Sequence, residues 1–158
     1  MDWSQIGAGL VGAVVAIALK GIVDWLREGR RQKHERGMRL LDRKIQASAD
    51  FMGAAERLWR AESGRLTAAY SLDNSRGQGD AVYQQHLAKY NEAVEATKSP
   101  WTDGQATLST VRLLMPEATS ECDVYFEACK NVDFPDKTRD ARDAARIEAE
   151  NALRSALR

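Results

Sequence analysis

The chain offers few side chains that could do chemistry, because its 158 residues include only two histidines and two cysteines. His34 lies in a basic run and His86 in a polar stretch, and neither has a partner at the spacing of a metal-binding motif. Cys122 and Cys129 would lie about 10 Å apart along a helix, which is too far for a mutual disulfide. We therefore expect two small buried thiols, two solvated histidines and no metal site.

Sequence motifs that mark enzymes are also missing. The sequence has no nucleophile elbow, no HExxH motif and no dinucleotide fingerprint, and GQGD at residues 77–80 lacks the preceding strand of a phosphate-binding loop. The paired ExxH motifs of di-metal helical bundles do not occur either. We expect no enzymatic activity, no cofactor and no small-molecule substrate.

An apolar stretch near the N-terminus predicts a single transmembrane helix over residues 6–26. A helix of 21 residues reaches about 31 Å, close to the thickness of the hydrocarbon core of a bilayer. Trp3 and Trp25 bracket this stretch as interfacial aromatic residues often do. Lys20 and Asp24 are spaced to pair near its end, where a lysine can extend its ammonium group toward the interface.

The charges that flank this stretch predict its orientation. Only Asp2 precedes it, whereas eight basic and three acidic residues lie between residues 27 and 44. The positive-inside rule then places the N-terminus outside and the rest of the chain in the cytoplasm, so we expect a protein of the cell inner membrane. Membrane lipid is the expected first partner, and the residues expected to contact anionic headgroups are Arg27, Arg30, Arg31, Lys33 and Arg36.

Nucleic acid is not an expected partner. The basic and acidic residues balance at 23 each, and the basic run directly follows the predicted membrane span. Small residues within the span form two rows at helical spacing, which let helix backbones approach closely in lipid. They predict packing between spans through Ala8, Gly9, Gly12, Ala13 and Ala16.

Three alternatives for the N-terminal stretch compete with a membrane span. Residues 16–18 loosely match a signal-peptide cleavage site, although the positive charge follows the apolar run instead of preceding it. The fourteen uncharged residues 6–19 could also form a buried core helix of a soluble protein. An interfacial helix would need a polar face, which these residues lack.

The rest of the sequence predicts an all-α fold, because helix-forming residues dominate and no alternating strand pattern occurs. We expect the span to continue into a long amphipathic helix, with a helix reversal at residues 73–80. The core-facing row of that helix should follow a heptad pattern, with Phe51, Leu58 and Leu72 beside it; its members are Met38, Leu41, Ile45, Ser48, Met52, Ala55, Trp59, Glu62, Leu66 and Ala69.

Further helices should complete a small antiparallel bundle. A helix over residues 81–98 should end at Ser99 and Pro100, and a third should begin near Asp103. Pro116 either kinks this third helix or begins a fourth one. The aromatic side chains expected in the core are Trp59, Tyr83, Tyr90 and Trp101, and the inner row expected after Pro116 is Ala118, Cys122, Tyr125, Cys129 and Val132.

The predicted domain organisation has four parts: an N-terminal segment 1–26, a basic juxtamembrane helix 27–44, a bundle 38–134 and a charged, alanine-rich helix 136–158 that packs weakly. With its apolar anchor, its REGRRQKHER junction and its alanine- and arginine-rich tail, the chain resembles uncharacterised single-pass proteins of bacterial, especially actinobacterial, and phage genomes. That resemblance is one of style and implies no activity. We expect a membrane-tethered helical interaction module that binds itself or a protein partner. The alternative is an oligomerising membrane effector, holin-like or of the defence type, that acts through its span.

Overall fold

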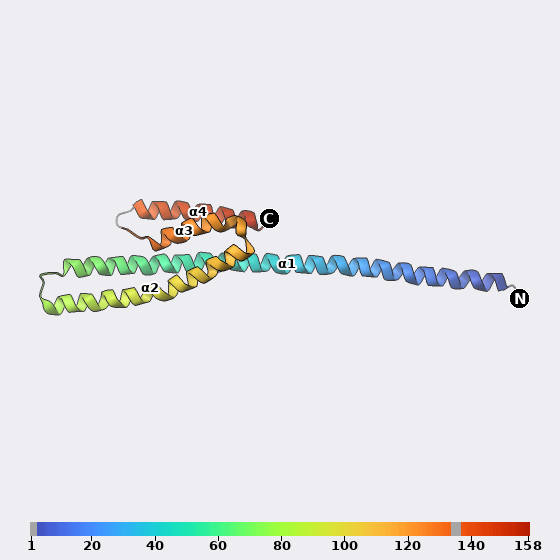
Figure 1. Cartoon of the computed structure of the whole chain (residues 1–158), viewed down its shortest axis with the longest axis horizontal. Coiled ribbons are helices and arrows are strands. Elements are labelled where there is room, and N and C mark those ends of the chain that lie inside the picture. Colours follow the sequence, from blue (N-terminus) through green and yellow to red (C-terminus); the bar gives the residue numbers. More distant parts are fainter. Residues whose placement is uncertain (1–2, 134–136) are drawn as a thin grey trace. The chain divides into compact units, whose positions relative to one another are not determined.

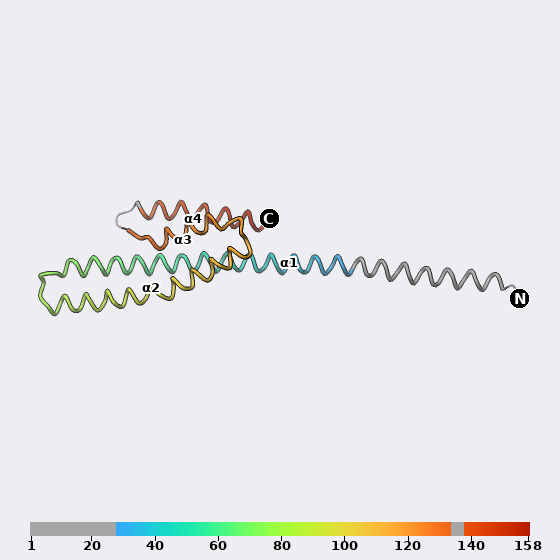
Figure 2. The backbone as a smooth tube through the Cα atoms, in the orientation of Figure 1, coloured from blue at the N-terminus to red at the C-terminus, as the bar shows by residue number. Residues whose placement is uncertain are grey.

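The computed structural model is all-helical, which confirms the predicted fold class (Figure 1). Its helices are α1 (Trp3–Asn74), α2 (Asp80–Leu114), α3 (Thr119–Lys130) and α4 (Lys137–Ala156), with a short 3-10 turn at Pro116–Ala118. The structure describes side chains for residues 28–133 and 138–158, the coloured parts of the backbone in Figure 2 apart from Lys137, and it contains no strand there.

The chain divides into two compact units, Met1–Asp42 and Arg43–Arg158. Within the first unit, every side chain from Glu28 to Leu40 is exposed to solvent. The second unit is a helical bundle with one hydrophobic core, to which α1, α2, α3 and α4 all contribute buried side chains.

The predicted helix reversal is confirmed at the hairpin between α1 and α2. Helix α1 ends at Asn74 and α2 begins at Asp80, and the two glycines between them have positive φ angles of 92° for Gly77 and 103° for Gly79. Such angles strain any residue with a Cβ atom, so the glycines are what permits the reversal.

The expected helix break at Pro100 was wrong, because α2 runs through this proline to Leu114. Pro100 has no backbone N–H and therefore cannot donate the helical hydrogen bond to the carbonyl oxygen of Ala96. A long helix can lose one such bond and bend instead of ending. Figure 1 shows α2 curving along its length. Trp101 was expected in the core but is 44% exposed, whereas Trp59 packs against the core.

Pro116 does not kink one helix but separates two: α2 ends at Leu114 and α3 begins at Thr119. Pro116 occupies the first position of the 3-10 turn that leads into α3, where its missing N–H costs nothing. The predicted inner row is confirmed for Ala118, Cys122, Tyr125 and Cys129, which are all buried. The last predicted member, Val132, lies beyond the end of α3 and is half-buried.

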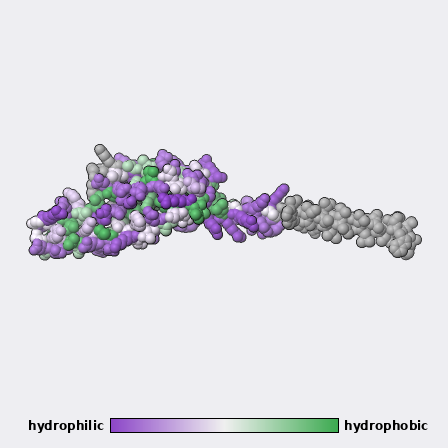
Figure 3. All heavy atoms as spheres, in the orientation of Figure 1, coloured by the Kyte–Doolittle hydropathy of each residue, from purple (hydrophilic) through white to green (hydrophobic). Residues whose placement is uncertain are grey.

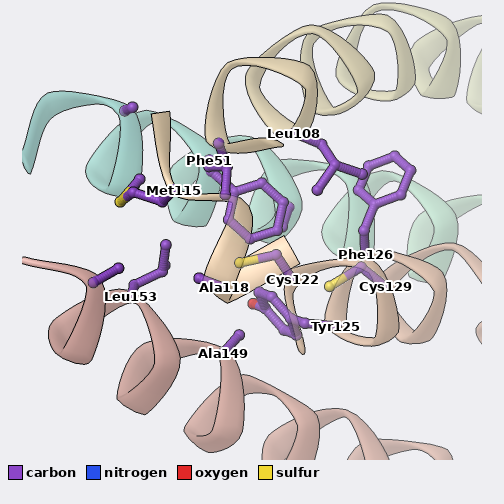
Figure 4. Packing of buried hydrophobic residues seen from close by; sticks show 14 of the residues in the cluster. Phe51, Leu108, Met115, Ala118, Cys122, Tyr125, Phe126, Cys129, Ala149 and Leu153 are labelled. Atoms are coloured by element: carbon purple, nitrogen blue, oxygen red, sulfur yellow. The ribbon is translucent and has the colours of Figure 1, made fainter. Parts of the chain in front are cut away.

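The predicted heptad row of α1 is confirmed in part, because Ala55 is fully buried and Met52 and Trp59 pack against the core. The centre of the buried face lies on the neighbouring row. Phe51 and Leu58, expected at its edge, are fully buried, whereas Met38 is 47% and Ile45 is 49% exposed. Figure 4 shows the ring of Phe51 among side chains from all four helices. Burial of the Phe51 ring removes a large apolar area from water.

The prediction that the C-terminal helix packs weakly was also wrong. Helix α4 contributes Ala149, Leu153 and Ala156 to the core, each at most 7% exposed. Its alanines present little apolar area, but their small size lets α4 lie close to its neighbours.

A glycine sets the closest approach of α2 to α3. A Cβ atom added at Gly104 would overlap the ring of Phe126, which is 1% exposed. Because glycine has no Cβ atom, Gly104 leaves room for the Phe126 ring in the core.

Candidate functional site

The most connected polar group of the bundle is the carboxylate of Glu56 on α1. Tyr125 on α3 donates a hydrogen bond of 2.7 Å from its hydroxyl group to Oε1 of Glu56. Arg146 on α4 donates to the same oxygen from Nη1 over 3.2 Å. The second oxygen, Oε2, lies 3.7 Å from Nη1 of Arg142. We call these four residues the Glu56 cluster; it ties three helices together around one carboxylate.

Arg142 is the most deeply buried charge of the Glu56 cluster, with a side chain that is 8% exposed. Its guanidinium group lies 3.9 Å from the centre of the Trp59 ring, which is cation–π geometry. It also donates to the carboxylate of Asp143, and this bond holds the pKa of Asp143 below its usual value. These contacts compensate the burial of this arginine in part, since its Nη1 atom is buried and has an ion pair with Glu56 but no hydrogen-bond partner among the described residues.

The two cysteines lie on α3, on either side of Tyr125 in the sequence, and both are free and buried, as expected. Burial raises the pKa of Cys122 to about 12 and that of Cys129 to about 11. Burial also raises the pKa of Tyr125 above its ordinary value. At neutral pH all three groups are protonated, so neither thiol is an activated nucleophile.

Within residues 28–133 and 138–158, no group of three or more His, Cys, Asp or Glu side chains could hold a metal ion. His34 is exposed, as expected, but His86 is half-buried and lines a groove between α1 and α2 together with Lys89 and Thr67. The Thr67 hydroxyl group already donates to the carbonyl of Ser63, so it offers a ligand only an acceptor.

A more apolar groove lies between α1 and α4. Its volume is about 300 Å³, and its walls combine apolar side chains with a charged rim on α4. We call it the α1–α4 groove and define it by its wall residues Ile45, Ser48, Ala49, Met52, Leu153 and Leu157 and its rim residues Arg146, Glu150 and Arg154.

The residues predicted to contact lipid headgroups lie on a fully exposed stretch of helix. Arg30, Arg31, Lys33 and Arg36 are all exposed, and Arg31 forms an ion pair of 3.0 Å with Glu35. This stretch is strongly hydrophilic in Figure 3. The side chain of Arg27 lies outside the described residues.

The predicted membrane span 6–26 and its small residues Ala8, Gly9, Gly12, Ala13 and Ala16 also lie outside the residues whose side chains are described. Among those that are, no helix combines the length and the apolar character needed to cross a bilayer.

Sequence reasoning did not single out the Glu56 cluster. One signal was available, because Arg142 continues the row of Ala145, Ala149, Ala152 and Ala156 at alternating spacings of three and four. A charge in register with an apolar row is a candidate for burial beside a partner. The row itself does not identify that partner, since Glu56 lies 86 positions earlier in the sequence.

Comparison of the chain with protein-family models, with curated proteins and with solved structures gave no match.

Proposed function

We propose that the protein is a membrane-tethered helical interaction module, with its bundle on the cytoplasmic face of the inner membrane. One observation supports this most directly: residues 28–40 form helix with every side chain exposed, and they carry five basic residues against two acidic ones. An exposed basic helix directly after an apolar stretch is typical of the cytoplasmic side of a membrane span. The N-terminus would then lie outside.

The character of the bundle supports binding over catalysis. Its largest polar cluster is committed to holding α1, α3 and α4 together, and its two thiols are protonated at neutral pH. Several large apolar side chains remain available on its surface, among them Leu113 at 85%, Val124 at 59% and Ile45 at 49% exposure. Exposed apolar side chains indicate a protein–protein contact where they gather on one surface, as Ile45 does with Ala49 and Met52 of α1.

The first test is membrane attachment of the full-length protein. We expect it to stay with the membrane fraction after an alkaline wash, and we expect the double variant Leu10→Asp, Val14→Asp to become soluble. Each charge placed in the centre of a span costs about 2.5 to 3.5 kcal/mol on insertion scales. The matched control is Leu113→Asp, because Leu113 is exposed in the bundle. A wild-type protein released by the wash would refute the tether.

The second test is orientation. We expect replacement of Arg30, Arg31, Lys33 and Arg36 by glutamine to invert a fraction of the molecules, as read by a reporter fused to the C-terminus. The control removes four exposed basic residues of the bundle: Arg57, Arg60, Lys89 and Lys98. Equal behaviour of both variants would contradict a topological role for the basic stretch.

The effector alternative predicts a different result on overproduction. If the spans assemble into a membrane-perturbing oligomer, overproduction should dissipate the membrane potential, and Gly12→Leu should prevent this by separating the helices. If cells keep their membrane potential during overproduction, the result argues against the effector and is consistent with the membrane tether.

A further inference from the structure

Part of α1 within the bundle unit presents an apolar ridge that no other described element covers completely. Ile45 is 49% exposed, Ala49 is exposed and Met52 is half-buried, and their spacing of four and three residues puts them on one side of the helix. The ridge forms one wall of the α1–α4 groove, and Leu153 and Leu157 of α4 belong to the opposite wall. The groove and the ridge are therefore adjacent parts of one surface.

Polar contacts between helices hold this groove in shape. Lys44 donates from Nζ to the carbonyl oxygen of Ala156 over 2.8 Å and lies 3.7 Å from Glu117. Farther along the groove, Arg146 binds Glu56 of α1 over 3.2 Å. These bonds fix α4 against α1 at both ends of the groove. A preformed groove loses less conformational entropy on binding than one that must open.

The charges on the rim select among possible occupants. Arg146, Glu150 and Arg154 follow one another at intervals of four residues on α4. Glu150 lies 2.9 Å from Arg146 and 3.5 Å from Arg154, so the rim carries both signs and its arginines already face a carboxylate. A strongly acidic or strongly basic partner would gain little from such a rim. A copy of the same surface brings the same mixture of signs, which suits a self-complementary contact.

We infer that the α1–α4 groove binds the α1 ridge of a second copy of this chain, in a two-fold symmetric dimer. In such a contact each copy supplies both a ridge and a groove, so the Ile45–Ala49–Met52 ridge of each lies between α1 and α4 of the other. Ala49 is small enough to permit close approach of the two α1 helices. The inference rests on the proposed interaction module and names its partner. Attachment of both copies to one membrane would raise their effective concentration.

The test measures the mass of the full-length protein in a mild detergent by light scattering. We expect the wild type to be a dimer and Ile45→Glu to shift it to monomer, with at least a ~10-fold rise in the dissociation constant. Ile147→Glu is the matched control, because Ile147 is also about half exposed but lies on α4 outside the groove lining. It should remain dimeric. An Ile45→Glu protein as dimeric as the wild type would overturn the inference.

A cross-linking experiment keeps the inference testable if Ile45→Glu disturbs folding. Ala49→Cys should form a covalent dimer in isolated membranes under mild oxidation, whereas Ile147→Cys should not. The native thiols Cys122 and Cys129 are buried and should not cross-link in the folded protein. Equal cross-linking by the two variants would count against the groove.

The same variants separate failure of this inference from failure of the proposed function. If the wild type is a monomer that stays with the membrane after the alkaline wash, the dimer is refuted and the membrane tether remains supported. A dimer that is dissociated by Gly12→Leu but not by Ile45→Glu would place the contact in the apolar segment and also overturn the inference. A soluble dimer that Ile45→Glu dissociates would support the groove and refute the tether.

Discussion

The hydroxyl group of Tyr125 donates a 2.7 Å hydrogen bond to the carboxylate of Glu56, and this bond joins α3 to α1 across the bundle. The edge of the Phe51 ring meets the Tyr125 ring, with 6.2 Å between their centres and an angle of 82° between their planes. Tyr125 therefore packs as a core aromatic residue while its polar end binds a carboxylate that α4 also binds through Arg146. Loss of this hydroxyl group should weaken contacts of α1 with two helices.

Tyr125→Phe should lower the free energy of unfolding by about 1 to 3 kcal/mol, because it removes a donor from a partly buried carboxylate and keeps the ring. Urea denaturation followed by circular dichroism measures this change. Tyr70→Phe is the control, since Tyr70 is 66% exposed and its replacement should change stability by less than ~0.5 kcal/mol. Equal effects at both positions would show that the bond to Glu56 contributes nothing.

Much of the fold follows from local signals in the sequence. The two glycines between residues 73 and 80 predict a reversal, and the structure has one there. The row of Ala118, Cys122, Tyr125 and Cys129 predicts the buried face of α3 because small and aromatic residues recur at helical spacing. Such signals lie within a few residues of the feature that they predict.

The errors concern features that depend on distant parts of the chain. Whether Pro100 breaks or bends a helix depends on the tertiary contacts around it, among them the contact of Gly104 with Phe126 of α3. Which row of α1 faces the core depends on where α3 and α4 dock. The Glu56 cluster joins residues 69 and 90 positions apart, and no spacing rule within one helix connects them.

Gly104→Ala should destabilise the protein, although alanine is the better helix former by about 1 kcal/mol. The added methyl group would overlap the Phe126 ring, and overpacking of a core costs about 1 to 3 kcal/mol. The two effects oppose each other, and we expect a net loss because the ring is buried against its neighbours. Thermal unfolding should show a lower Tm.

Gly64→Ala provides the matched comparison. Gly64 also lies inside a long helix, but a Cβ atom added there would meet nothing within 4 Å. The same substitution should therefore raise stability by up to about 1 kcal/mol. If both variants were stabilised, the Phe126 ring would have to move freely, contrary to tight packing at Gly104.

Stability should fall as the pH rises from about 9 to about 12. The thiols of Cys122 and Cys129 have an ordinary pKa of 9.0, which burial in the folded protein raises to about 12 and about 11. In this range the unfolded chain has released these protons while the folded protein retains them, so deprotonation favours unfolding. Urea denaturation at several pH values measures the slope.

The double variant Cys122→Ala, Cys129→Ala should flatten that slope below pH 10, where the thiols are the main groups with raised pKa values. Tyr125 retains its own raised pKa, so some decline should persist at higher pH. Thiol labelling gives an independent check: at pH 8 both cysteines should react slowly in the folded protein and rapidly in urea. An unchanged slope in the double variant would contradict the assignment to the thiols.

Arg142→Ala should destabilise the bundle by about 2 kcal/mol or more, because it removes the cation over Trp59 and one of the charges beside Glu56. Arg139→Ala is the control, since Arg139 is exposed on the same helix and its loss should be nearly neutral. Because Arg142 lies on α4 and contacts Trp59 and Glu56 of α1, the loss should appear first as release of α4. Hydrogen exchange should therefore speed up in α4 before it does in α1. Uniform acceleration across all helices would mean that Arg142 stabilises the bundle as a whole and that α4 does not open separately.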